Sequence, residues 1–417
     1  MQRTYDQEQT KKLEELLKNG FSLCRIMEYI DLGADPGFRD SNGNSLHHFI
    51  IYELTRATES SAYCFTCMEV LVQKYNIDIN IKNDDGLTPL AYLISFKSTK
   101  EKFLFSLKMV EILNADSNIK NRNGTSFIFY IINNNREEHS NLQELIKNEK
   151  INPFMDTHIK PMEFKSLKQN FTIAETTNAT VYNCTWNNTK AAFKKTHIGS
   201  PKDFNSKLRR FINEVTLMEK LAQDDVPNVI KFIGCEIEKN SVLSFNILME
   251  LAECTLADLF QNEQPYCWCI RLKMMSEMAN AVSYLHDVYG FVHADIKPQN
   301  IFIGKNKQIK LGDYNLSFKN GTKKGSRGTN FYMAPETEQG CTYATDIYSL
   351  AMTLFDFAMW TITKSEKRPL IAKDCPTGAA KLITLGMLTE PEKRPPASKY
   401  KIDLEIEAKN YSEIKHL

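Results

Sequence analysis

The sequence predicts an α+β chain in two parts: an N-terminal α-helical region built from repeats, and a larger domain with two lobes. Polar turns that end in glycine recur through the first third of the chain, and each leads into an apolar helix. From residue 171 the pattern changes to β-strands. A long amphipathic helix over residues 267–288 then leads into a hairpin whose turns carry acidic side chains.

Size and composition are those of an ordinary protein of two or three domains. The chain has 417 residues, 42% of them hydrophobic and 25% charged, and its net charge of +1 excludes attraction to nucleic acid or membrane by bulk charge alone. The N-terminus lacks the apolar core of a signal peptide, and Asp356 interrupts the apolar run 349–363, which favours a buried helix. Ten cysteines without framework spacing favour a reducing compartment. We therefore expect a cytoplasmic protein, with the nucleus as an alternative.

Two of the cysteines, Cys64 and Cys67, form a CxxC motif downstream of His47 and His48. A zinc site of this kind needs a second ligand pair at a defined spacing, and the sequence has none. Two ordinary helix cysteines are therefore favoured over a zinc site.

Three polar turns recur within residues 33–46, 75–90 and 113–127. Each ends in Asn-Gly or Asp-Gly, where glycine allows the positive φ of the turn, and continues with a Ser or Thr that can cap a helix. The glycines recur about every 40 residues, whereas the ankyrin repeats that this pattern resembles have a period of roughly 33. The best match is DDGLTPL at 84–90, and the other two turns lack its Thr-Pro pair.

The resemblance implies an ankyrin-repeat-like domain over residues 1–156 that forms a solenoid. Residues 8–32 would be a capping helix pair, and residues 142–154 a closing helix with the start of another turn. Such a domain would recognise a protein partner on its concave face. A small irregular helical domain is the alternative.

Strand periodicity selects one lysine from the segment KAAFKK at 190–195. Ala192 and Lys194 fall on one face of the predicted strand, and Lys195 falls on the other, towards solvent. Because Ala192 is small enough to admit a flat ligand, Lys194 is the candidate phosphate-binding lysine. A helix is expected next, over residues 204–221, and Glu214 is its candidate site residue.

The stretch GFVHADIKPQNIFI at 290–303 carries the residues on which the functional prediction depends. Asp295 is placed to accept a proton from a substrate hydroxyl, and Lys297 to neutralise a transferred group. Asn300, together with Asp313 at the end of the next strand, offers hard oxygen ligands for Mg²⁺. A hairpin with incidental acids is the alternative.

This spacing resembles the catalytic and metal-binding loops of the protein kinases. The Lys297-Pro298 pair is similar to the serine/threonine branch of that family. The similarity covers about 164–400 with its motifs in order. The fold class is thus α+β, an α-helical ankyrin-repeat solenoid followed by a bilobal protein-kinase fold.

The domain boundaries follow from the two resemblances. The kinase domain is expected over residues 166–400. A linker is expected at 157–165, and a C-terminal tail at 401–417.

The kinase resemblance assigns further residues to an ATP pocket. Glu214 would form an ion pair with Lys194 and keep that lysine charged. Met249 would stand in front of the hinge, where backbone groups of Glu250 and Ala252 would bond the adenine edge. The other residues implied to line the nucleotide are Ala174, Val181, Ala192 and Phe302.

The hairpin over residues 171–182 departs from the kinase pattern. Ala174, Thr176 and Ala179 stand where kinases have three glycines. A side chain at these positions stiffens the loop and shields the backbone amides that would approach phosphates.

Two further departures lie in the large lobe. Ala294 replaces an arginine that in many kinases holds a phosphate of the activation loop, which implies weak control by phosphorylation of that loop. Asn315 replaces a glycine after Asp313 and Tyr314, and asparagine tolerates the positive φ expected at that position. Thr322 and Ser326 are expected as exposed hydroxyls in a basic loop.

Other positions resemble structural residues of the family. Thr329 would bridge Asp295 and Lys297, and Asp346 would anchor the backbone of the catalytic loop. Arg394 would form a buried ion pair with Glu336.

Three functional hypotheses follow. The first is a serine/threonine protein kinase that transfers the γ-phosphate of MgATP to protein hydroxyls, with Asp295 and Lys297 catalytic and Asn300 and Asp313 binding the metal. The second is an inactive or weak pseudokinase scaffold that binds nucleotide and recruits partners. The third is that the repeats sense RNA or oligoadenylates, since the chain resembles the RNA-activated translation-factor kinases and part of the 2-5A-dependent ribonuclease. Too few residues follow Arg394 for a nuclease domain.

Overall fold

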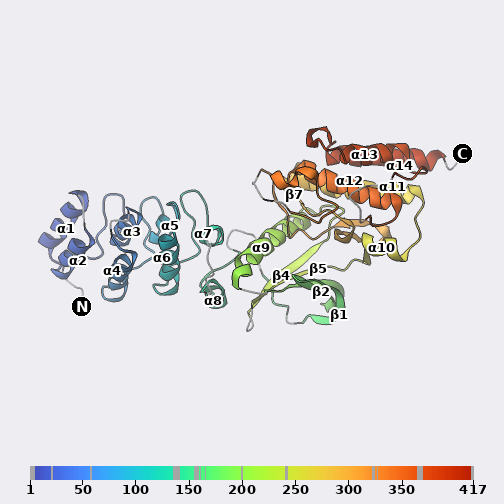
Figure 1. Cartoon of the computed structure of the whole chain (residues 1–417). Coiled ribbons are helices and arrows are strands. Elements are labelled where there is room, and N and C mark those ends of the chain that lie inside the picture. The colour runs from blue at the N-terminus through green and yellow to red at the C-terminus, as the bar shows by residue number, and fades with distance from the viewer. Residues whose placement is uncertain are drawn as a thin grey trace. The chain divides into compact units, whose positions relative to one another are not determined.

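The computed structural model describes residues 5–414 except 20–21, 57–58, 135–140, 155–158, 160, 165, 199–200, 240–242, 322–324, 326 and 364–369. The chain divides into two compact units (Figure 1). The first is Met1–His158 with Gly199–Ser206, and the second is Ile159–Ile198 with Lys207–Leu417. The predicted hydroxyls of Thr322 and Ser326 lie outside the described residues.

The first unit is helical, as the apolar periodicity predicts. Its helices are α1 (Gln7–Asn19), α2 (Leu23–Asp31), α3 (Leu46–Arg56), α4 (Ser61–Gln73), α5 (Pro89–Leu93), α6 (Lys100–Glu111), α7 (Phe127–Asn134) and α8 (Asn141–Lys147). Thr88 caps α5 by accepting the N–H of Ala91, and Pro89 occupies the first turn, where its missing N–H costs nothing.

Three turns, which precede α3, α5 and α7, share one geometry. A glycine donates its N–H to the backbone oxygen three residues earlier: Gly43 to Asp40, Gly86 to Asn83 and Gly124 to Asn121, at 3.0, 2.9 and 2.9 Å. The side chains of Asp40, Asn83 and Asn121 also accept backbone N–H groups of their own turns. Because φ lies between 71° and 75° at all three glycines, a side chain there would strain the backbone.

Two adjacent histidines of α3 have opposite surroundings. His48 bridges two of the turns, with Nδ1 2.9 Å from Ser45 Oγ and Nε2 3.0 Å from the backbone oxygen of Leu87. His47 is fully buried, and within the described residues neither of its ring nitrogens has a hydrogen-bond partner. Burial lowers the pKa of His47 to about 3, so the ring is neutral in the folded chain.

The CxxC cysteines of α4 are buried thiols. Burial raises the pKa of Cys64 to about 12 and that of Cys67 to about 11. Over the described residues, no group of three His, Cys, Asp or Glu side chains could hold a metal ion.

The small lobe of the second unit is a five-stranded antiparallel sheet in the order β1-β2-β3-β5-β4. Its elements are β1 (Lys168–Glu175), β2 (Ala179–Trp186), β3 (Thr189–Thr196), α9 (Pro201–Gln223), β4 (Phe232–Lys239) and β5 (Leu243–Glu250). The edge strand β1 is exposed along its whole length, whereas β5 is buried over its first six residues.

The chain just before β1 is packed on this sheet. The N–H of Met162 donates to the backbone oxygen of Cys235 at 2.8 Å. Phe164 is buried against Phe193, with ring centroids 5.9 Å apart. A Cβ on Gly234 would lie 2.6 Å from the Met162 sulfur, so this glycine makes room for the segment. The expected linker, 157–165, is therefore partly a component of the small lobe, and its residues 157, 158, 160 and 165 lie outside the described part.

The large lobe is mainly helical, with short strands around the catalytic stretch. Its helices and strands are β6 (Cys254–Thr255), α10 (Leu256–Asn262), α11 (Trp268–Ser283), β7 (Phe291–Val292), β8 (Ile301–Ile303), β9 (Ile309–Leu311), β10 (Phe318–Lys319), α12 (Tyr343–Met359), α13 (Thr377–Gly386) and α14 (Ala397–Ile414). Shorter helical turns cover Tyr284–Val288, Pro298–Asn300, Lys305–Lys307, Pro335–Gln339 and Pro391–Lys393.

Two features of the large lobe refine the expectations from sequence. The expected helix at 267–288 is α11 followed by the wider π-helical turn Tyr284–Val288. Residues 401–414 of the expected tail continue α14, which packs along α11 (Figure 1). Among the helices of the described chain, none combines the length and apolarity required to cross a membrane.

Candidate active site

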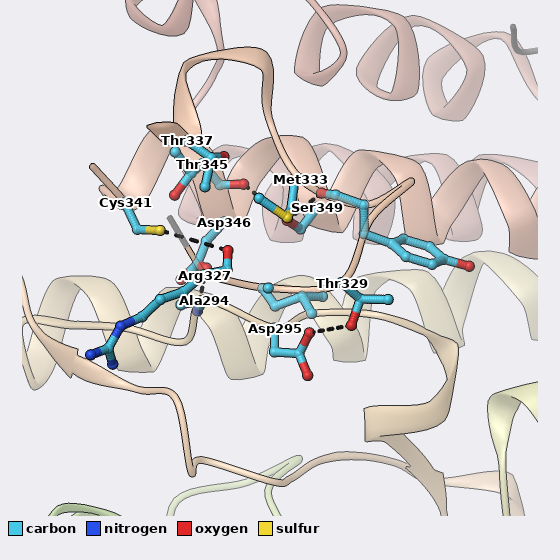
Figure 2. A pocket seen from close by; sticks show the side chains of 13 residues that line it. Ala294, Asp295, Arg327, Thr329, Met333, Thr337, Cys341, Thr345, Asp346 and Ser349 are labelled. Atoms are coloured by element: carbon cyan, nitrogen blue, oxygen red, sulfur yellow. Dashed lines mark hydrogen bonds between the residues drawn. The ribbon is translucent and has the colours of Figure 1, made fainter. Parts of the chain in front are cut away.

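The catalytic stretch forms a closed network of short hydrogen bonds around Asp295. Lys297 Nζ lies 2.7 Å from Asp295 Oδ2 and 2.7 Å from Thr329 Oγ1. The Thr329 hydroxyl donates in turn to Asp295 Oδ1 at 2.7 Å (Figure 2). Asp295 is 8% exposed. Each carboxylate oxygen is therefore held in place, as a positioned proton acceptor requires.

Asn300 is oriented by the same carboxylate. Its Nδ2 donates to the backbone oxygen of Asp295 at 2.8 Å and to Oδ2 at 3.0 Å. The amide nitrogen is thereby directed at Asp295, and the amide oxygen has no protein partner within the described residues. An oxygen left in this way is a suitable ligand for Mg²⁺.

Asp346, at the start of the buried helix α12, anchors the backbone of the stretch. Its carboxylate accepts the N–H groups of His293 and Ala294 at 2.6 and 2.8 Å, and His286 Nε2 lies 2.9 Å away. Ala294 has a φ of 67°, a conformation that costs an L-residue about 1 kcal/mol. The two backbone hydrogen bonds to Asp346 offset that cost and fix the direction in which the side chain of Asp295 points.

Lys194 joins two carboxylates at the junction of the lobes. Its Nζ lies 2.7 Å from Glu214 Oε1 and 2.7 Å from Asp313 Oδ1. Burial opposes its charge, but the carboxylates of Asp313 and Glu214 hold the pKa of Lys194 above its ordinary value. Burial likewise opposes the charge of Asp313, and the Lys194 ammonium still holds the pKa of Asp313 below its ordinary value. Because one ammonium serves two carboxylates, burial prevails at Glu214 and raises its pKa.

The backbone conformation after β9 differs from the sequence expectation. Asn315 was expected to take the positive φ of the glycine that it replaces. Instead Asp313 does so, with φ 59°, and Asn315 does not. The ring of Tyr314 is fully buried 5.3 Å from that of His293, and its hydroxyl donates to the backbone oxygen of Leu311 at 2.8 Å. The bend at Asp313 turns its carboxylate towards Lys194.

The residues expected around the adenine ring lie on β2, β3, β5 and β8. Ala192 is buried and pairs with Met249 across β3 and β5. Val181 pairs with Lys194 across β2 and β3 and is half-buried, like Phe302 on β8.

The two hinge residues differ in what their backbone offers. The N–H of Glu250 is taken by the backbone oxygen of Lys231 at 3.0 Å, so this group is not offered to a ligand. The N–H of Ala252 has no partner within the described residues and is the better candidate donor.

The tip of the β1–β2 hairpin is closed by one of its own side chains. Thr176 Oγ1 accepts the N–H groups of Asn178 and Ala179 at 3.3 and 3.1 Å, and its hydroxyl lies 3.0 Å from the Ala179 carbonyl. Ala174, further back on β1, is exposed. The tip amides that a phosphate would need are therefore already bonded.

Thr176 was expected only as a position without glycine, and its bonds to the backbone of the hairpin tip were not predicted. The clasp by Thr176 could have been anticipated from a threonine at the start of a tight turn, since its hydroxyl can bond backbone N–H groups two and three residues later.

A small pocket of about 10 Å³ lies beside Asp295 and Thr329, between the catalytic stretch and the segment 327–349 (Figure 2). Ala294 lines it and also belongs to an apolar cluster with Val292, Phe318 and Cys341. Where an arginine is expected in many kinases, this chain thus has apolar packing.

A buried ion pair joins two segments of the large lobe. Arg394 bonds both oxygens of Glu336, at 2.6 and 2.9 Å. Lys195, expected to face solvent, is only partly exposed and pairs with Glu238 at 2.8 Å.

The sheet of the small lobe, the helical large lobe and the Lys194, Asp295 and Asp313 groups between them define the class of two-lobed phosphotransferases. A model of the protein kinase domain matches residues 168–398, more than half of the chain. The chain therefore belongs to the protein kinase family, and its domain is of the serine/threonine type. Domains of this family in general use ATP and Mg²⁺.

The chain is similar to several curated kinases over this domain. A probable LIM domain-containing serine/threonine-protein kinase of Dictyostelium discoideum is 29% identical over 47% of this chain and 33% of that protein. The dual specificity protein kinase shkE of the same organism is 29% identical over 48% and 32%. The serine/threonine-protein kinase CHK1 of Saccharomyces cerevisiae is 34% identical over 39% and 32%. The chain thus spans about a third of the length of these relatives.

Proposed function

We propose that this chain is an active serine/threonine protein kinase that transfers the γ-phosphate of MgATP to hydroxyl groups of a protein substrate. Asp295 accepts the proton of the attacking hydroxyl, and Lys297 stabilises the charge on the transferred group. Lys194, held by Glu214, positions the nucleotide phosphates.

The metal ligands of this proposal are Asn300 and Asp313. The oxygen of the Asn300 amide and the second oxygen of Asp313 have no protein partner within the described residues, so both remain for coordination. Hard oxygen ligands of this kind suit Mg²⁺, which would neutralise phosphate charge when bound.

The observation that carries the proposal is the simultaneous presence of two intact networks. Lys194 bonds Glu214 and Asp313, and Asp295 bonds Lys297 and Thr329, all at 2.7 Å. The two networks hold charged groups where phosphoryl transfer needs them, one at the nucleotide phosphates and one at the attacking hydroxyl.

The test is transfer of labelled γ-phosphate from ATP to the protein itself and to a generic basic substrate. We expect label on serine or threonine, and Asp295→Asn should lower the rate about 10²- to 10⁴-fold by removing the proton acceptor. Asp287→Asn is the matched control, since Asp287 is an exposed carboxylate whose one side-chain bond among the described residues is to Ser283. Equal labelling by the wild type and Asp295→Asn would contradict the proposal.

A second function, a pseudokinase scaffold, is favoured by one observation. Thr176 occupies the tip amides of a hairpin that has no glycine, which weakens the expected hold on phosphate. A rise in melting temperature with ATP that needs no Mg²⁺, together with no transfer, would favour this function.

For the helical unit we propose ankyrin-type repeats that recognise a protein partner. The proposal is supported by the shared geometry of the three turns and by His48, which ties the first turn to the second. In such a stack each repeat is stabilised by its neighbours. Gly86→Val should therefore speed amide exchange in the repeats on both sides, while exchange confined to its own turn would contradict a stack.

A further inference from the structure

A second close pair of cysteines lies apart from the nucleotide site, at the start of α11. Cys267 is the N-cap residue of the helix and Cys269 lies in its first turn. Their Sγ atoms are 2.8 Å apart, whereas a disulfide bond measures about 2.05 Å. The two side chains are therefore thiols in contact. Cys267 is exposed and Cys269 is partly exposed.

The residue between them is firmly anchored. Trp268 is 6% exposed, and its Nε1 donates to Asp374 Oδ2 at 3.0 Å. The guanidinium carbon of Arg271 lies 3.7 Å from its ring centroid. Because Trp268 is fixed inward, the flanking thiols are held together on the outer side, and the sulfurs need to approach by less than about 1 Å to bond.

The other close pair, Cys64 and Cys67, provides an internal comparison. Both are buried, and burial raises the pKa of these thiols to about 12 and about 11, so the reactive thiolate is scarce. Cys267 and Cys269 combine contact between sulfurs with access to solvent, and the N-terminal end of a helix favours an anion such as a thiolate.

We propose that Cys267 and Cys269 form a reversible disulfide when the protein meets hydrogen peroxide. The thiolate of Cys267 attacks one peroxide oxygen, the O–O bond breaks, and Cys267 becomes a sulfenic acid as hydroxide leaves. The sulfur of Cys269 then attacks the Cys267 sulfur, the S–O bond breaks, and the oxygen leaves as water with the thiol proton. Overall, two thiols lose two electrons and one peroxide becomes two waters.

The product should be readily reversed by thiols. One residue separates the cysteines, so the ring that the bond closes is small, and strained disulfides are the more easily reduced ones. Glutathione should therefore return the pair to the thiol state.

The test uses the full-length protein, treated with hydrogen peroxide, blocked with N-ethylmaleimide and digested with trypsin. One peptide, 240–271, contains Cys254, Cys267 and Cys269, and another, 57–74, contains Cys64 and Cys67. We expect the first peptide to lose two hydrogens and to carry a single N-ethylmaleimide group, on Cys254. This change should be at least about ten-fold faster than the loss of two hydrogens from the second peptide. Equal rates, or a bond that includes Cys254, would overturn the proposal.

A variant separates bond formation from simple oxidation. In Cys269→Ser the sulfenic acid on Cys267 has no neighbouring thiol, so it should persist and be captured by dimedone. In the wild type the capture should be at least about ten-fold lower, because Cys269 closes the bond first. Equal capture in both proteins would overturn the proposed closure.

Discussion

The catalytic stretch and the β1–β2 hairpin, which serve the same nucleotide in the proposed reaction, are built in opposite ways. Asp295 is buried, and Lys297, Asn300 and Thr329 all bond its carboxylate. The hairpin has no glycine, its first strand is fully exposed, and Thr176 bonds its own tip.

The difference separates two tasks that are combined in phosphoryl transfer. Charges that stabilise the transition state must be fixed in advance, whereas a loop over the phosphates contributes mainly to binding. This chain retains the fixed charges around Asp295 and weakens the loop over the phosphates. We therefore expect a nearly intact rate at saturating ATP and a high KM for ATP.

The largest effect should come from Lys194→Met. The change leaves Glu214 and Asp313 buried without their cation, which should cost about 3 kcal/mol of unfolding free energy and at least about 100-fold in kcat/KM for ATP. Urea unfolding and transfer assays measure the two effects. Lys195→Met is the control, since its partly exposed pair with Glu238 should contribute at most about 1 kcal/mol. Equal losses in both variants would remove the distinction between the two lysines.

A smaller effect should come from Asn300→Asp, which tests the metal side of the stretch. The new carboxylate cannot donate to Asp295, so two bonds to that residue are lost and a like charge faces it. We expect kcat to fall about 10- to 100-fold, with a changed Mg²⁺ requirement. A Mg²⁺ titration of the initial rate measures this. An unchanged titration curve would exclude Asn300 as a ligand.

A smaller effect, of opposite sign, should come from Thr176→Gly. Removing the hydroxyl releases the N–H groups of Asn178 and Ala179 for phosphate, so KM for ATP should fall about three- to ten-fold with little change in kcat. Thr177→Gly is the control, because it loosens the same turn without releasing either amide. If both variants lower KM equally, the lower KM comes from a more flexible turn and not from release of the two N–H groups.

The smallest effect on phosphate transfer should come from His47→Leu in the helical unit. We expect no change in activity, but a gain of about 1–3 kcal/mol in the stability of that unit, because two unpartnered ring nitrogens are removed. His48→Leu should instead destabilise the unit, since it breaks the contacts with Ser45 and Leu87.

The same variant tests pH dependence. The pKa of His47 is lowered from 6.5 to about 3, so below pH 6.5 the unfolded chain binds a proton that the fold excludes. Stability should therefore fall with pH from about 6.5 towards 3, by up to about 1.4 kcal/mol per pH unit. His47→Leu should flatten this slope, as measured by amide exchange in α3. An unchanged slope would mean that His47 is not the group that titrates.

The sequence predicted the parts of the site that depend on local period and on motif order. Alternation along β3 distinguished Lys194 from Lys195, and the spacing of 309–313 located Asp313, which the structure pairs with Lys194. These features are visible because a strand repeats every two residues and a hairpin keeps its ends close.

What the sequence did not predict depends on contacts between distant segments or on competing backbone choices. Asparagine tolerates positive φ, which pointed to Asn315, yet the ion pair with Lys194 favours the bend at Asp313. The packing of Phe164 on Phe193 joins segments that no periodicity relates. The bonds from the tip amides to Thr176 are local, and a threonine at the start of a tight turn is the one signal in the sequence that points to them.

The insertion of Phe164 also bears on how the domain is cut out for expression. A shortened protein that begins at residue 168, where the family match begins, would lack this ring and leave Phe193 and Trp186 facing water or an empty space. Loss of a buried phenylalanine costs about 3–5 kcal/mol, a large share of the stability of a typical domain. A start at residue 159, where the second compact unit begins, would retain Met162 and Phe164, so we expect an expressed domain that begins there to be the more stable one.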